Sequence, residues 1–131
     1  MPPEAAARWL AYAESDLAVA RGGDWTGVLS ETLCFHAQQA AEKAIKAVLI
    51  ASRIEPSRTH DLAVLMAAVP EGMAIGIDLQ SVAALTVYSV ASRYPGDDEP
   101  VGVEEHAQAL ATAIEVVGWA KRIVAATLPT E

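Results

Sequence analysis

The stretch from Ser30 to Ser52 constrains the fold more than any other part of this chain. Its apolar residues recur at the spacing of an α-helix with a buried face. Additional alanines widen this apolar stripe to well over half of the helix circumference, which is typical of a helix packed on several sides. The stripe and its extension comprise Cys34, Ala37, Ala40, Ala41, Ala44, Ile45, Ala47, Val48 and Ala51. We therefore predict a central helix over 30–52, with Ser30 as its N-cap.

Proline and glycine divide the rest of the chain into further helical segments. The predicted helices span about Glu4–Arg21, His60–Ala68, Asp78–Ser92 and Val103–Leu128. Thr59 is the expected N-cap of the short helix over His60–Ala68, the third in chain order. No segment alternates polar and apolar residues over a useful length, so no sheet is expected. The prediction is an all-α fold in which residues 1–131 form one domain, an antiparallel up-and-down bundle of four main helices plus a short helix.

The charge balance restricts the kind of partner. Seventeen acidic and nine basic residues give a formal charge of −8, which repels phosphate backbones and anionic lipid surfaces. A basic partner protein suits this surface, whereas a nucleotide or an RNA would need a local basic spot. The single cysteine, Cys34, excludes an intrachain disulfide and is interpreted as a small buried hydrophobe.

The sequence shows no targeting or membrane segment. The first residues lack a basic region followed by an apolar run, and no stretch of about 18 apolar residues is free of charges. We therefore expect a cytoplasmic protein that makes no membrane contact.

Four features resemble a known family when they are taken in order. The phrase CFHAQQAAEKAIKA covers residues 34–47, and Ala13-x-x-Asp16-Leu17-x-x-Ala20 lies in the first helix. His60-Asp61-Leu62 and Arg93-Tyr94-Pro95 follow later. Together they span nearly the whole chain and resemble the HEPN domain family. The resemblance implies an up-and-down helical bundle that dimerises.

The same resemblance implies a function. Many HEPN proteins act beside a minimal nucleotidyltransferase as a toxin–antitoxin pair, and the family name records a proposed nucleotide-binding role. Toxic members are metal-independent ribonucleases that use an arginine, four to six residues and then a histidine, assembled across a dimer cleft. Arg53 and His60 satisfy this count, whereas Arg93 has the better position but is separated by twelve intervening residues from the next histidine, His106.

His60, Arg93 and Arg53 are accordingly the catalytic candidates. RNA cleavage without a metal requires a base for the 2′-hydroxyl and a cation for the developing phosphate charge, which histidine and arginine can supply. We predict that His60 and Arg93 approach each other across a cleft. In the alternative interpretation, the His60 ring only bonds to a neighbouring helix.

Lys43, Lys46 and Tyr94 are the candidates for nucleotide or RNA binding. The two lysines could form a basic spot for phosphate, or they could belong to a solvated helix face on which Glu42 and Lys46 pair. Tyr94 could stack on a base, with Arg93 as a phosphate clamp. Equally, both residues could form a structural stop at the end of the fourth helix.

Asp16, Gln38 and Glu42 are the candidates for a polar network. Asp16 and Gln38 fall on apolar faces of their helices, and buried acids and amides need hydrogen-bond partners. They could bond one another, bond a further helix or line a cleft. No cluster has the spacing of metal ligands and no glycine-rich phosphate loop is present, so we expect neither a metal nor a cofactor.

Three functions therefore stay open. The first is a homodimeric HEPN protein that partners a nucleotidyltransferase and binds a nucleotide or RNA. The second is a metal-independent ribonuclease toxin that uses His60 and an arginine. The third is a structural dimerisation module without a ligand.

Overall fold

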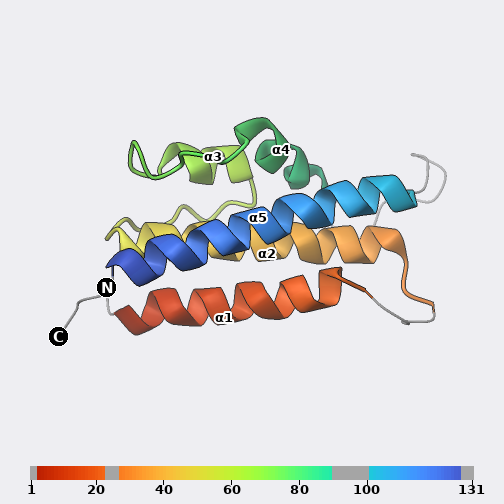
Figure 1. The fold of residues 1–131 in the computed structure, drawn as a ribbon, viewed down its shortest axis with the longest axis horizontal. Helices are drawn as coiled ribbons and strands as arrows, with labels where there is room; N and C mark the ends of the chain where they lie inside the picture. The colour runs from red at the N-terminus through yellow and green to blue at the C-terminus, as the bar shows by residue number, and fades with distance from the viewer. Residues whose placement is uncertain (1–2, 23–26, 90–100, 128–131) are drawn as a thin grey trace.

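Three long helices lie side by side beneath a layer of shorter elements (Figure 1). The computed structural model describes residues 3–22, 27–89 and 101–127. The long helices are α1 (Pro3–Ala20), α2 (Ser30–Ala51) and α5 (Val103–Thr127). The upper layer contains α3 (Leu62–Ala67), α4 (Leu79–Ala84) and the 3₁₀ helix η1 (Leu85–Ser89). These three ranges contain no strand, and none of their helices is long and apolar enough to cross a membrane.

The chain runs up and down through four legs, of which the third is broken. α2 runs antiparallel to α1, the segment from α3 to η1 runs back over α2, and α5 returns alongside α2 (Figure 1). The predicted all-α bundle is thus confirmed. The predicted fourth helix is wrong in length, because its α-helical part ends at Ala84. The β-branched residues Thr86 and Val87 follow there, and such residues lower helix propensity.

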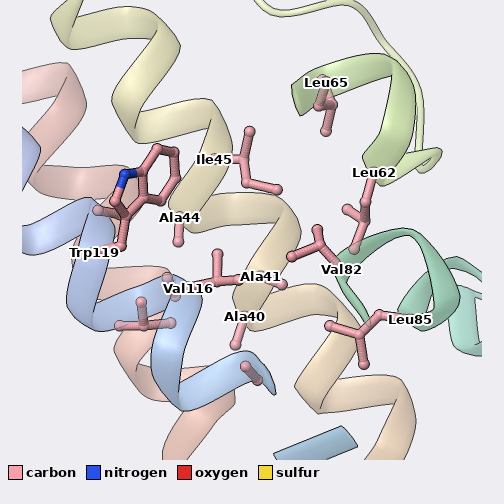
Figure 2. Packing of buried hydrophobic residues seen from close by; sticks show 14 of the residues in the cluster. Ala40, Ala41, Ala44, Ile45, Leu62, Leu65, Val82, Leu85, Val116 and Trp119 are labelled. Carbon is pink, nitrogen blue, oxygen red and sulfur yellow. The ribbon is translucent and has the colours of Figure 1, made fainter. Parts of the chain in front are cut away.

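α2 is the central helix, as its apolar stripe predicts. It contacts α1, α5, α3 and η1. In Figure 2, α2 lies between α5, which contributes Val116 and Trp119, and the layer of short elements, which contributes Leu62, Leu65, Val82 and Leu85. The alanines of α2 between Ala37 and Ala47 are fully buried and allow these neighbours to come close.

Two predicted helix caps are wrong. Leu29 stands at the N-cap of α2 and provides no side-chain hydrogen bond, so Ser30 is already the first helical residue. α3 is capped by Asp61, whose carboxylate accepts hydrogen bonds from the two backbone N–H groups of Ala63 and Val64. Thr59 instead accepts a hydrogen bond from the backbone N–H of Asp61 at 3.0 Å. α3 therefore begins at Leu62 rather than at His60.

The end of α2 reverses the chain through a left-handed residue. Arg53 has φ = 63°. The backbone N–H of Ile54 donates to the carbonyl of Leu49 at 2.8 Å, and that of Arg53 donates to Ile50 at 3.0 Å. These two bonds form a Schellman motif, in which glycine usually occupies the left-handed position. The reversal sends residues 54–61 back along α2, where His60 reaches the middle of that helix.

Candidate functional site

Glu42 of α2 is the centre of a buried polar network. It is only 4% exposed. Its Oε1 accepts a hydrogen bond from Nε2 of Gln38 at 3.2 Å and lies 2.8 Å from Nδ1 of His60. Its Oε2 accepts a hydrogen bond from Nζ of Lys46 at 3.0 Å. Both carboxylate oxygens are thus bonded, as a charge away from water requires.

Lys46 is buried with its acid partner. The expected Glu42–Lys46 pair is present, but the interpretation as a solvated face is wrong, because Lys46 is only 9% exposed. Its ammonium also lies 5.6 Å from the centre of the Trp9 ring of α1, a cation–π geometry. The spacing within α2 could not reveal this burial, since the covering groups come from α1 and from the segment around His60.

His60 joins this network to the surface. Its side chain is 66% exposed, although its Nδ1 reaches the buried Glu42. The backbone carbonyl of His60 accepts a hydrogen bond from Nε2 of Gln38 at 3.2 Å. Gln38 is fully buried and is itself held by Gln39, whose Nε2 donates to its Oε1 at 2.7 Å. Within the described ranges, no hydrogen bond reaches Nε2 of His60.

The surroundings of Glu42 favour its charged form. Burial acts to raise the pKa of the Glu42 carboxyl and is the largest single influence. The hydrogen bonds from His60, Gln38 and Lys46, together with the Lys46 charge, outweigh burial and leave the pKa below its ordinary value. Glu42 therefore acts as an ionised acceptor.

A second, separate cluster links α1 to α2. Oδ1 of Asp16 lies 2.8 Å from Nδ1 of His36, and Oδ2 of Asp16 accepts a hydrogen bond from Nζ of Lys43 at 2.6 Å. All three side chains are half-buried. Asp16 and Gln38 do not bond each other, so the candidate polar residues divide between two networks. Each candidate lysine of α2 is paired with a carboxylate.

Neither arginine candidate is found beside His60 in the described part of the chain. Arg53 is exposed at the left-handed turn after α2, and the described part of the chain gives no hydrogen bond or ion pair between it and His60. Arg93 and Tyr94 lie outside the described residues, and so does the predicted approach of Arg93 to His60. His106 of α5 lies apart from these networks, with its Nε2 2.8 Å from the carbonyl oxygen of Ala20. The described residues contain no group of three or more side chains that could hold a metal ion.

A small pocket lies between the short layer and α5. It encloses about 140 Å³, and Tyr88 donates a hydrogen bond to Glu105 at its wall. Its lining residues are Ser81, Ala84, Leu85, Tyr88, Glu105, Gln108, Ala109 and Thr112. None of them belongs to the networks around Glu42 or Asp16. Sequence reasoning did not identify this pocket, because its residues come from segments that meet only in the fold.

Comparisons with known proteins agree with the sequence resemblance. The chain matches the HEPN domain over residues 6–123. It is similar to the crystal structure of ST0689, an archaeal HEPN homologue, with 29% identity, a TM-score of 0.67 and coverage of 91% of this chain and 97% of the other. It is also similar to TT1696 from Thermus thermophilus, with 31% identity, a TM-score of 0.60 and coverage of 93% and 94%. No curated protein matches the chain.

Proposed function

The chain belongs to the HEPN domain family, and on this basis we propose that it is the partner protein of a minimal nucleotidyltransferase. In this proposal the chain forms a homodimer and acts with the nucleotidyltransferase in a toxin–antitoxin-like pair. The observation that carries the proposal is the surface of the outer layer, which we define as residues 59–89.

The outer layer suits a basic protein partner. It exposes the large apolar side chains of Val64, Ile75, Leu79 and Val87. It contains three exposed acids, Asp61, Glu71 and Asp78, and no lysine or arginine. Exposed apolar groups among like charges are typical of a surface that docks on a partner of opposite charge.

The pairing of the α2 lysines supports a protein partner over a bare phosphate. Lys43 is bound by Asp16 and Lys46 by Glu42. A phosphate group would have to compete with these carboxylates for both ammonium groups. A nucleotide or an RNA is therefore a secondary ligand in this proposal.

The test is to search the neighbouring genes for a minimal nucleotidyltransferase and to co-purify it with this chain, followed by light scattering to give the mass of the complex. The chain alone should have the mass of a dimer and should form a stable complex with that enzyme. Leu79→Lys should weaken the complex by about tenfold or more, because it places a positive charge against the basic surface of the partner. Tyr12→Lys is the matched control, since Tyr12 on α1 is 53% exposed and Leu79 is 55% exposed. Absence of a complex, or equal loss in both variants, would contradict the proposal.

A metal-independent ribonuclease is the second candidate, and the geometry of His60 favours it. An exposed imidazole held by an ionised carboxylate is the arrangement of many general bases. Arg93 or Arg53 would supply the cation. RNA cleavage by the pure protein in EDTA should disappear in His60→Ala and persist in His36→Ala, since His36 is also carboxylate-bound but half-buried. No cleavage by the folded protein would remove this candidate.

A further inference from the structure

The three histidines of the chain are held in two ways. Nδ1 of His60 lies 2.8 Å from a Glu42 oxygen, and Nδ1 of His36 lies 2.8 Å from an Asp16 oxygen. In His106 the bonded atom is instead Nε2, whose partner is the carbonyl oxygen of Ala20. Carbonyl and ionised carboxylate oxygens can only accept hydrogen bonds, so the ring nitrogen facing each of them must carry the proton.

The exposed ring of His60 carries its proton on Nδ1. Glu42 already accepts hydrogen bonds from Gln38 and Lys46 and has no proton to give, so Nδ1 of His60 is the donor. In the neutral ring the remaining nitrogen, Nε2, is then unprotonated. Since two thirds of the side chain is exposed, that nitrogen is available to a ligand.

The network also restricts movement of His60 at two points. Nε2 of Gln38 donates both to the His60 carbonyl and to the Glu42 oxygen that holds the ring. The backbone carbonyl of His60 and the carboxylate that holds its ring are therefore bonded to the same buried amide. The other end of that amide, Oε1 of Gln38, accepts a hydrogen bond from Nε2 of Gln39.

We infer that Glu42 and Gln38 are positioning residues that lock His60 in its Nδ1–H form and present Nε2 as a fixed hydrogen-bond acceptor for a hydroxyl or N–H group of a ligand. Only the identity of this ligand group rests on the proposed ribonuclease function. If the protein is a ribonuclease, the group is the 2′-hydroxyl of RNA. A loosely solvated histidine would instead populate both neutral forms and several ring orientations.

The experiment is a long-range ¹H–¹⁵N correlation spectrum of the full chain labelled with ¹⁵N, at a pH where the rings are neutral. This spectrum distinguishes protonated from unprotonated ring nitrogens. His60 should show the unprotonated signal at Nε2, whereas His106 should show it at Nδ1 and serve as the internal reference of opposite form. An unprotonated Nδ1 in His60 of the wild-type protein would overturn the inference without any variant.

Two conservative variants test the cause. Glu42→Gln replaces an obligate acceptor by an amide that can also donate, so His60 should become a mixture of both forms. Asp16→Asn is the matched control and should change His36 alone. An unchanged His60 in folded Glu42→Gln would refute the positioning role. RNA cleavage tests the function separately: an inactive protein with the Nδ1–H form would refute the ribonuclease candidate and leave this inference standing.

Discussion

His60 Nδ1 lies 2.8 Å from Oε1 of Glu42 and so joins a largely exposed ring to a carboxylate that is 4% exposed. The opposite oxygen of Glu42 is held by the buried Lys46. One carboxylate therefore balances a buried cation and fixes a surface imidazole. This double role makes Glu42 the residue whose replacement has the widest consequences.

Replacing Glu42 by alanine should destabilise the fold by about 3–5 kcal/mol, because Lys46 would stay buried without its counter-charge. The double variant Glu42→Leu with Lys46→Met should recover most of this loss, since apolar side chains of similar size can replace a buried ion pair. Urea unfolding measures both free energies. A loss below about 1 kcal/mol in Glu42→Ala would show that the pair is not buried in solution.

The stability that Glu42 contributes should depend on pH. Its pKa is lower in the fold than its ordinary value of 4.5, so its contribution is complete above that pH and disappears as the pH falls through the lower, folded-state value. The unfolding free energy of the wild type should therefore decline towards that of Glu42→Gln in acid. A difference between the two proteins that stays constant from neutral pH to pH values well below 4.5 would contradict the lowered pKa.

Arg53→Gly should stabilise the protein by about 0.5–1 kcal/mol, because glycine adopts the left-handed conformation without steric cost. Arg53→Ala removes the same guanidinium but keeps the strained backbone, so it is the matched control and should bring no gain. Thermal and urea unfolding report the stabilities. RNA cleavage lost in both variants would identify Arg53, rather than Arg93, as the cation of the ribonuclease candidate.

Asp61→Ala should cost about 1 kcal/mol, since it removes the cap from two backbone N–H groups of α3. Ser30→Ala should change the unfolding free energy by less than about 0.5 kcal/mol, because Ser30 does not cap α2. Asp61→Ala thus tests a cap that the structure shows, and Ser30→Ala tests a cap that only the sequence predicts. A larger loss in Ser30→Ala than in Asp61→Ala would reverse this assignment.

The helical fold could be predicted because its signals are local. The alanine-rich stripe of α2 predicted its central position. Glycine, proline and the helical periodicity of the apolar residues placed the ends of the long helices within a residue or two of those observed. The third leg, from α3 to η1, was harder to predict because its end depends on tertiary contacts. Oγ1 of Thr86, for example, accepts a hydrogen bond from the backbone N–H of Leu62, which ties η1 to the start of α3.

The candidate site was predictable only as a set of residue types. The apolar positions of Asp16 and Gln38 required partners, and the structure supplies them. The burial of Glu42 and Lys46 could not be predicted, because it depends on Trp9 and on the return of the chain after Arg53. That return depends in turn on a left-handed arginine, for which the sequence gives no signal.

The most direct measurement is the rate at which diethyl pyrocarbonate modifies each histidine of the native protein, followed by mass spectrometry. His60 should react first, because two thirds of its side chain is exposed and no hydrogen bond within the described residues reaches its Nε2. His36 and His106 should both react more slowly, because their side chains are half-buried. A His60 that is as protected as His106 would contradict the outward-facing acceptor and the site built on it.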